Sequence, residues 1–275
     1  MNNMLDIVIP VKNSFSEKNY SIYYTLKVLL YQKSVYTKIF IVDDNSNDNT
    51  IEYLKKDFSF ATNVVFLNNR GNGVAEARNF GAANGNASLI LFIDDDTILF
   101  DEFTLSNTVL DFDSYSFSCG ALRYWAPINW SIHLMKIDTC KSWQNILKKI
   151  STDAKGIDRQ TGMLDLNHIS FIGNFGLIKR EVFEKINGFP TIYKGWGMED
   201  THLMYSLCLN NYDYGLFGEK GIKVYHLNHT IENHASFVRN YKQFKELQKA
   251  NGILFNEAAF FNEASSIEPV LSPIK

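Results

Sequence analysis

The sequence predicts an α/β fold with a mostly parallel central sheet and helices on both of its faces. In the first third of the chain, short apolar runs alternate with segments in which apolar residues recur at helical spacing. The apolar runs have few polar interruptions, as buried parallel strands require; Ile39–Val42 and Leu89–Ile93 are examples. With 45% hydrophobic residues, the 275-residue chain can bury one large core or two small ones.

The expected elements alternate regularly through residue 93. The apolar runs predict strands at Asp6–Val11, Lys38–Val42, Asn63–Leu67 and Ser88–Ile93. The segments between them predict helices at Ser16–Gln32, Asn49–Phe58 and Gly73–Gly85.

Beyond residue 100 the alternation is less regular. Further strands are predicted at Ser116–Tyr124, Ile169–Ile178 and Lys223–His226. Further helices are predicted at Arg180–Ile186, Glu199–Leu209 and Ala235–Lys249. Residues 125–168 show no readable period, and the last ten residues are predicted to be a loose tail.

Composition excludes several classes of protein. A net charge of −3 gives no general electrostatic reason to bind nucleic acid. The apolar runs fall short of the roughly 20 residues that a membrane-spanning helix needs, and no basic region precedes the first of them. The 3 cysteines lie far apart and form no metal-binding spacing. We therefore expect a reduced cytoplasmic protein, with a position at the inner membrane face left open.

The predicted strands end in unusually acidic turns. Asp43 and Asp44 follow the second strand, and Asp94–Asp96 follow the fourth. Ligands of open α/β sheets bind at the carboxyl ends of the strands, so these acids are expected to meet at one edge. Clustered carboxylates repel one another unless a cation shares them, and oxygen ligands suit Mg²⁺ or Mn²⁺. One such turn could be an ordinary solvated turn; two favour a metal site.

A glycine turn and the helix after it form a third motif. Arg70–Gly73 would let the backbone approach a ligand closely, and Arg78 lies about one turn into the helix. A cation near a helix N-terminus opposes the helix dipole unless it serves an anion such as phosphate. Taken alone, however, such a pair of glycines is usually just a turn.

The segment Gly195–Asp200 opens the Glu199–Leu209 helix. Acids in a first helical turn favour the dipole, which is an ordinary structural reason for them. In a functional interpretation, Asp200 is a general base, because a carboxylate at a helix N-terminus keeps a low pKa and stays ionised. The glycines beside Trp196 predict a mobile loop that carries an aromatic platform for a sugar.

Two histidines, His226 and His229, lie near the end of the last predicted strand. His226 or His229 would add a nitrogen ligand to the metal at the acidic edge, and His226 is the one that we favour.

Taken in order, these motifs resemble those of the family 2 glycosyltransferases, which have the GT-A fold. The matching segments are Val8–Asn13, Val42–Ser46, Asn72–Asn79, Asp94–Asp96, Gly173–Arg180 and Gly188–Phe189. The Trp-Gly-x-Glu-Asp sequence within Gly195–Asp200 is especially similar to the galactosyl- and N-acetylgalactosaminyltransferase branch. Lys12 and Met198 depart from the family's pattern, and neither replaces a carboxylate.

The resemblance implies an inverting, metal-dependent enzyme that moves a hexose or N-acetylhexosamine from a UDP-sugar to an acceptor hydroxyl. Asp200 would deprotonate the acceptor and Glu199 would bind sugar hydroxyls. Asp96 and His226 would bind the cofactor, Mn²⁺ or Mg²⁺. The residues expected to contact the donor are Pro10, Asn13, Asp44, Asn72, Arg78, Asp94, Asp95 and Trp196.

Within that donor set, three roles follow from the resemblance. Asp44 would hydrogen-bond the uracil, Asp94 would contact the ribose, and Arg78 would steady the phosphate or the donor sugar.

The resemblance also implies a division of one GT-A domain. Residues 1–100 would bind the nucleotide sugar, residues 101–230 would bind the acceptor and carry catalysis, and residues 231–275 would form a C-terminal helical extension. The acceptor would be a glycan, a lipid-linked molecule or a peptide in surface polysaccharide or glycoconjugate synthesis. Peripheral membrane contact and a homodimer are left open.

Two other classes remain as alternatives. A nucleotidyltransferase shares the parallel sheet, the metal and the nucleotide, but it would usually need a glycine-rich basic loop after the first strand, and Pro10–Asn13 is not one. A non-catalytic sugar-nucleotide or glycan-binding module would be expected to have lost carboxylates that this chain retains.

Overall fold

The computed structural model describes residues 4–69, 73–110, 112–119, 121–125, 173–227 and 234–250. Its first part alternates strands and helices as predicted. The strands are β1 (Met4–Val11), β2 (Tyr36–Asp43), β3 (Val64–Asn68) and β4 (Leu89–Ile93). The helices between them are α1 (Ser21–Leu30), α2 (Thr50–Asp57) and α3 (Val74–Ala83).

The first helix begins later than predicted. Asn19 and Tyr20 have left-handed backbone angles, with φ of 49° and 64°, so the chain turns before α1 begins at Ser21. The apolar residues that predicted the helix, such as Ile22 and Leu26, lie within α1, and only the predicted start at Ser16 is too early.

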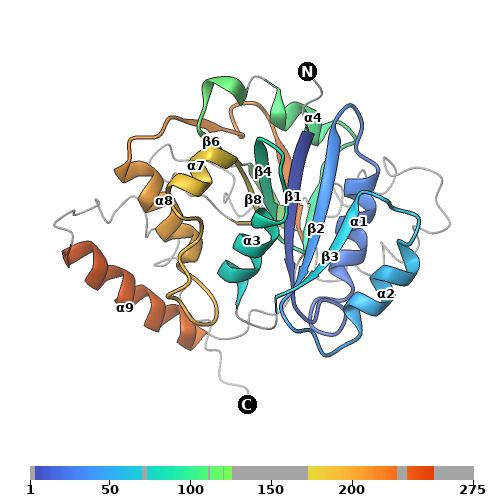
Figure 1. The fold of residues 1–275 in the computed structure, drawn as a ribbon, viewed down its shortest axis with the longest axis horizontal. Coiled ribbons are helices and arrows are strands. Elements are labelled where there is room, and N and C mark those ends of the chain that lie inside the picture. The colour runs from blue at the N-terminus through green and yellow to red at the C-terminus, as the bar shows by residue number, and fades with distance from the viewer. Residues whose placement is uncertain are drawn as a thin grey trace, which may run out of the picture.

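The central sheet has seven strands in the order β3-β2-β1-β4-β8-β6-β9 (Figure 1). The new members are β6 (Phe117–Cys119), β8 (Phe175–Lys179) and β9 (Tyr214–Leu216). Strand β8 runs antiparallel to both of its neighbours, and the other pairs are parallel. The chain moves outward from β1 to β3 and then returns to place β4 on the other side of β1. This reversal creates the switch point at which open α/β sheets bind ligands.

A small second sheet has the order β5-β10-β7. Its strands are β5 (Thr97–Leu99), β10 (Lys223–His226) and β7 (Leu122–Trp125). The prediction of one strand at Ser116–Tyr124 is wrong, because β6 and β7 belong to different sheets. The strand predicted at Ile169–Ile178 begins later than predicted, at Phe175, because residues 173 and 174 form a turn. Residues 169–172 lie outside the described residues.

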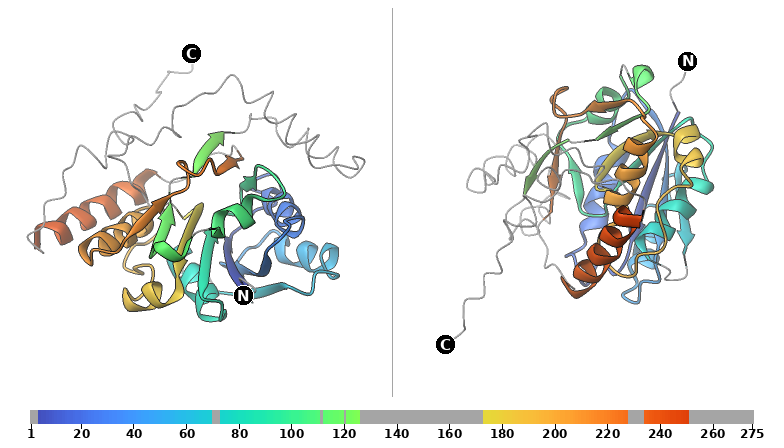
Figure 2. Two further views of the ribbon diagram at one scale, coloured as in Figure 1. Left: turned by 90° about the horizontal axis from the view of Figure 1, so that it is seen from above. Right: turned by 90° about the vertical axis from the view of Figure 1, so that its left-hand side faces the viewer.

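The remaining helices match the predictions closely where predictions were made. They are α4 (Thr104–Val109), a 3₁₀ turn at Phe112–Ser114, α7 (Arg180–Lys185), α8 (Glu199–Leu209) and α9 (His234–Ala250). Helix α9 lies beside α8, on the side of the molecule away from α2 (Figures 1 and 2). No helix in the described part of the chain is long and apolar enough to cross a bilayer.

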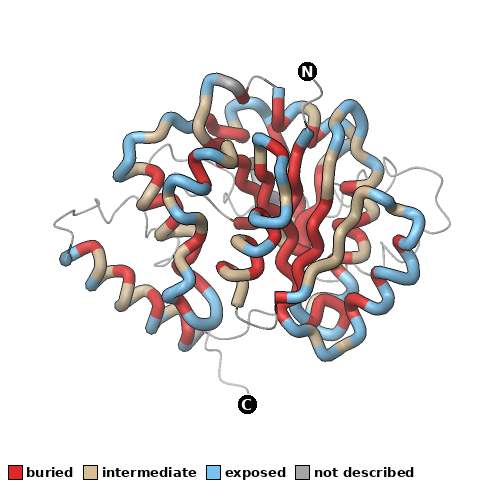
Figure 3. The backbone as a smooth tube through the Cα atoms, viewed as in Figure 1, coloured by how far each residue is buried: buried red, intermediate tan, exposed pale blue. Residues whose placement is uncertain are grey.

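The buried hydrophobic residues form two main clusters, one on each face of the sheet. The backbone of the central strands is coloured as buried along most of its length (Figure 3). In β1, Ile7 and Ile9 join the core that α1 covers, and Val8 joins the core under α3. A Cβ at Gly81 of α3 would lie 2.4 Å from a methyl carbon of Val8, so only glycine allows α3 to pack this closely. Close packing of α3 fixes where its N-terminus meets the sheet's carboxyl edge.

Candidate active site

The carboxyl ends of β1, β2 and β4 meet at one edge of the sheet. Asp43 of β2 pairs with Val11 of β1, and β8 begins at the same edge, where Phe175 pairs with Ile93 of β4. Backbone bonds hold the next residues here: the amide of Asp44 donates to the carbonyl of Val11 over 2.8 Å. The edge therefore collects the acidic turns that the sequence predicted would meet.

Asp44 is buried at this edge and joins three elements. Its Oδ1 accepts from Asn69 Nδ2 at 2.8 Å and from the backbone amide of Gly73 at 2.9 Å. The ammonium of Lys12 lies 3.8 Å from Oδ2. Asn69 follows β3 directly and was missed, although the same strand-end argument that selected Asp44 would have found it.

Asn13 connects the loops that follow β1 and β2. Its backbone is left-handed, with a φ of 47°. Its Nδ2 donates to Glu17 Oε1 at 2.6 Å, and its Oδ1 accepts from the amide of Asn47 at 2.9 Å. Pro10, also selected from the sequence, is buried near the end of β1. Asn72 lies outside the described residues.

A chain of ion pairs, with a buried arginine at its centre, links the end of β4 to the start of α8. Arg78 donates from one terminal nitrogen to Asp94 Oδ1 at 2.8 Å and from the other to Glu199 Oε1 at 3.0 Å. Its side chain is 4% exposed, and a Cβ at Gly173 would lie 2.2 Å from the guanidinium. Arg78 thus links two carboxylates. Both of its terminal nitrogens bind protein side chains, whereas the sequence predicted that Arg78 would contact the phosphate or the sugar of a donor.

Within the Asp94–Arg78–Glu199 group, two buried polar atoms lack a hydrogen-bond partner among the described residues. They are Arg78 Nε and Glu199 Oε2, and both are buried. One cation also faces two anions here. Unpaired polar atoms and excess charge in one cleft are typical of a functional site.

Asp200 follows Glu199 in the first turn of α8. Burial raises its pKa to about 7, and the charge of Glu199 acts in the same direction against the opposing effect of Arg78. The expectation of a low pKa is therefore wrong, because burial and a neighbouring carboxylate outweigh the helix dipole. A base with a pKa near neutrality suits general-base catalysis better than a strongly acidic carboxyl.

Asp95 and Asp96 share an ammonium that the sequence analysis missed. Lys18 Nζ lies 2.6 Å from Asp95 Oδ1 and 3.2 Å from Asp96 Oδ2. Burial would lower the pKa of Lys18, but the two carboxylates outweigh it and the pKa is raised. Burial raises the pKa of Asp95 to about 6 despite Lys18. Asp95 therefore bonds to a lysine inside the protein, and its predicted donor contact gains no support from this geometry.

Asp96 and His226 converge as the predicted metal ligands. His226 Nε2 lies 3.5 Å from Asp96 Oδ1, and the amide of Leu227 donates to the carbonyl of Asp96 over 2.8 Å, which ties the two segments together. No group of three or more acidic, histidine or cysteine side chains suited to a metal occurs in the described residues. The carboxylate oxygen of Asp96 suits Mn²⁺ or Mg²⁺ when substrate phosphates supply further ligands, and the imidazole nitrogen of His226 suits Mn²⁺ better than Mg²⁺, which strongly prefers oxygen ligands. His229 lies outside the described residues.

A narrow cleft runs between the start of α3 and the segment before α8. Its walls include Gly73, Glu76, Tyr193, Gly195 and Glu199. The cleft thus lies where the carboxyl edge meets the predicted catalytic segment.

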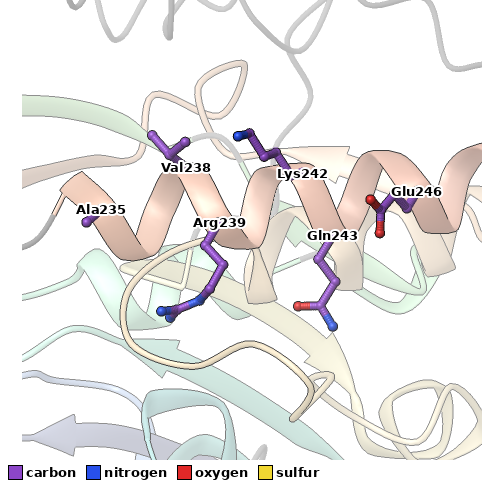
Figure 4. Close-up of a pocket in the computed structure, with 6 residues that line it drawn as sticks. All are labelled: Ala235, Val238, Arg239, Lys242, Gln243 and Glu246. Atoms are coloured by element: carbon purple, nitrogen blue, oxygen red, sulfur yellow. The ribbon is translucent and has the colours of Figure 1, made fainter.

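Trp196 lies at this segment and is 46% exposed, with its ring 5.3 Å from that of Phe237. A separate shallow hollow lies along the surface of α9 (Figure 4). It is lined by Ala235, Val238, Arg239, Lys242, Gln243 and Glu246. All of these belong to one helix and none is a predicted site residue, so we do not place the active site in that hollow.

The sequence of this chain matches the model of "Glycosyl transferase family 2" over residues 6–186. The chain belongs to glycosyl transferase family 2. The model "N-terminal domain of galactosyltransferase" matches residues 162–230, which include the Gly195–Asp200 segment.

One curated relative is an "Uncharacterized glycosyltransferase" of Haemophilus influenzae, 32% identical over 99 residues. The match covers 36% of this chain and 31% of that relative, so the chain aligns with about a third of its length.

Solved structures share the fold at low identity. A mannosyltransferase from Pyrobaculum calidifontis, in complex with GDP-Man and Mn²⁺, gives a TM-score of 0.55 at 16% identity, over 84% of this chain and 58% of that one. The S. aureus protein TarS 1–349, in complex with UDP-GlcNAc, gives 0.57 at 16% identity, over 83% and 60%. These matches confirm the predicted GT-A fold class, and the enzyme class predicted from the motifs is that of the family.

Proposed function

We propose that this family 2 member is an inverting, metal-dependent glycosyltransferase that uses a UDP-sugar donor. The observation that carries the proposal is the Asp94–Arg78–Glu199 chain. It joins the acidic end of β4, where a nucleotide sugar would bind, to the first turn of α8, where Asp200 lies. One buried arginine thus sets the distance between the donor-binding edge and the proposed base.

In this proposal, each residue at the edge has one task. Asp44 accepts from the uracil through its remaining oxygen, Asp94 holds the ribose, and Asp96 with His226 holds the metal. A divalent ion bound there would neutralise the diphosphate leaving group as charge develops on it. Asp200 takes the proton of the acceptor hydroxyl as that oxygen attacks the anomeric carbon from the opposite face.

Glu199 has a different task from Asp200 because it is bonded to Arg78. Its Oε2 has no hydrogen-bond partner among the described residues and can accept from a sugar hydroxyl. Trp196 would supply a flat apolar face for a sugar ring.

For the donor and the acceptor, we propose classes of compound and not single compounds. We propose a UDP-hexose or UDP-N-acetylhexosamine as the donor, supported by the galactosyltransferase match over residues 162–230. The acceptor would be a glycan, a lipid-linked molecule or a peptide in glycoconjugate or surface polysaccharide synthesis. Residues 101–230 would bind it, residues 1–100 would bind the donor, and residues 231–275 would extend the domain. A location at the inner membrane face and a homodimer belong to the same proposal.

The decisive experiment measures release of UDP from a panel of UDP-sugars with Mn²⁺, with Mg²⁺ and with EDTA. We expect slow hydrolysis of one UDP-sugar with metal and none in EDTA. Full activity in EDTA would remove the metal from the proposal. A nucleotide sugar that binds in calorimetry without any turnover would favour a non-catalytic module, and pyrophosphate release from a nucleoside triphosphate would favour a nucleotidyltransferase.

The donor base is tested separately with UDP and GDP. We expect UDP to bind more tightly, because guanine would leave the Asp44 carboxylate mispaired. Equal calorimetric affinities would contradict the role given to Asp44.

A further inference from the structure

Helix α9 contacts the loop that carries Trp196 with several polar side chains. Asn240 is fully buried, and its Nδ2 lies within hydrogen-bond distance of three backbone carbonyls: those of Lys194 at 3.2 Å, Trp196 at 3.1 Å and Gly197 at 3.1 Å. Three acceptors around one terminal atom admit only the donor end of the amide, which fixes how this side chain points.

Two neighbours on α9 extend the contact. Ser236 Oγ accepts from the amide of Trp196 at 3.1 Å and lies 3.3 Å from its carbonyl, and Arg239 donates to the carbonyl of Lys194. The loop backbone from residue 194 to residue 197 is thus bonded to one face of α9.

The loop glycines are required by this contact. Gly195 and Gly197 have φ of +77° and +96°, and a Cβ on them would lie 2.8 Å from Ser236 Cβ and 2.7 Å from Phe237 Cδ2. The glycines therefore serve close approach to α9 and a left-handed backbone. From the sequence, the two glycines predicted a mobile loop. In the structure, hydrogen bonds to α9 fix the backbone of this loop.

An apolar layer continues the contact below the loop. Tyr193 and Met198, on either side of it, pack with Tyr205 of α8 and Phe244 of α9 in a core cluster of their own. Met198 is the residue immediately before Glu199, so anything that holds the loop also sets where α8 begins.

We propose that Asn240 is a positioning residue for the active site: by binding three carbonyls of the 194–197 loop, it fixes the places of Trp196 and of the proposed base Asp200. This inference rests on the proposed function for the roles of those two residues. According to this inference, α9 helps to position the active-site residues. The sequence of α9 indicates only an apolar face that packs on the core and a charged face. Misplacing a catalytic group by about 1 Å typically costs on the order of 100-fold in rate.

The test compares Asn240→Leu with Gln248→Leu. Both changes replace a buried amide of α9 by an apolar side chain, and residue 248 lies about two turns further along the helix. In Asn240→Leu we expect kcat for sugar transfer to fall about 10- to 100-fold, the affinity for UDP to stay within about twofold, and trypsin to cut after the exposed Lys194 faster than in the natural protein. Gln248→Leu should leave these three quantities near their natural values.

Several outcomes separate this inference from its alternatives. Unchanged kcat and unchanged cleavage after Lys194 in Asn240→Leu would overturn it. An equal loss in both variants would overturn it too, because it would indicate a general weakening of α9. If Asn240→Leu does not fold, Ser236→Ala removes the contacts of the Ser236 hydroxyl with Trp196, leaves those of Asn240, and should show the same pattern to a smaller extent. If the natural protein turns over no sugar nucleotide, the proposed function fails, while faster cleavage in Asn240→Leu would still support the held loop.

Discussion

Two arginines bind carboxylates at opposite edges of the central sheet, and they differ in how completely they are bonded. At the amino edge, Arg180 donates from all three guanidinium nitrogens: to Asp6 Oδ2 at 2.6 Å and to the carbonyls of Ala82 at 2.6 Å and Ala87 at 2.7 Å. At the carboxyl edge, Arg78 serves two carboxylates and leaves its Nε without a partner among the described residues.

The difference indicates what each edge is for. Arg180 binds the buried Asp6, lies 4.0 Å from the exposed Glu184, and links β1, the end of α3 and the approach to β4, which is a structural task. Arg78 lies in a region with more acids than bases and with buried polar atoms left unpaired among the described residues, which is typical of a functional site. The comparison predicts that changes at the amino edge reduce stability and that changes at the carboxyl edge reduce turnover.

The largest expected effect is on turnover. Asp200→Asn keeps the shape of the side chain and removes the base, so kcat should fall by about 10²- to 10⁴-fold while UDP affinity barely changes. Steady-state kinetics together with calorimetry check both parts. A near-normal kcat would transfer the role of base to Glu199 or exclude the inverting mechanism.

At the amino edge the expected effect is on stability. Arg180→Met leaves the fully buried Asp6 without its cation, which should lower the free energy of unfolding by about 3–5 kcal/mol. Denaturant unfolding measures this, with Lys185→Met on the exposed face of α7 as the control. The fraction that remains folded should bind UDP normally; a specific loss of UDP affinity would show that the two edges are not independent.

A smaller effect is expected from Asp44→Asn. The new side chain keeps an oxygen for Asn69 and for the amide of Gly73, so the fold at this edge should survive. The loss of charge should weaken UDP binding about tenfold, as expected for one charge-assisted hydrogen bond. Calorimetry with UDP tests it, and an unchanged affinity would remove uracil recognition from Asp44.

The last expected effect is the dependence of stability on pH. The pKa of Asp200 is about 7 in the folded protein and 3.8 in its ordinary state, so the folded form binds this proton more tightly. The stability that the proton contributes is complete below pH 4 and is lost as the pH rises through 7.

The Asp200→Asn variant should not lose this stability as the pH rises, because asparagine does not titrate. Between pH 5 and pH 8, its free energy of unfolding should rise relative to the natural protein by about 1–3 kcal/mol. Denaturant unfolding at the two pH values measures the change. A constant difference between the two proteins would contradict the raised pKa.

Much of the fold could be predicted because the signals are local. Apolar runs such as Leu89–Ile93 and the acidic residues at strand ends depend only on neighbours in sequence, and the carboxyl-edge rule places them together. The short strands β5 and β9 were missed because three residues carry too little pattern. The break between β6 and β7 was missed because the two strands separate only through pairing with distant partners.

The candidate site was predictable in its carboxylates and in Arg78, but not in Lys18. Asp44, Asp96 and Asp200 follow recognisable elements, whereas Lys18 lies in a loop and reaches Asp95 across 77 positions of sequence. The pKa of Asp200 was also beyond the sequence, because it depends on burial by segments far from α8. Asn240 has no sequence signal at all, since an asparagine on a helix is ordinarily a surface residue.

The place of β8 in the sheet constrains the order in which the chain can fold. Strand β6 precedes β8 in sequence, yet β8 separates it from β4. While the chain is being synthesised, the edge of β4 therefore has no partner until residues 175–179 have emerged. The unpaired strand, β4, has the sequence Leu-Ile-Leu-Phe-Ile, and such an apolar edge readily pairs with other chains. We expect shortened forms that end before residue 175 to aggregate, even though they contain the complete β1–β4 unit.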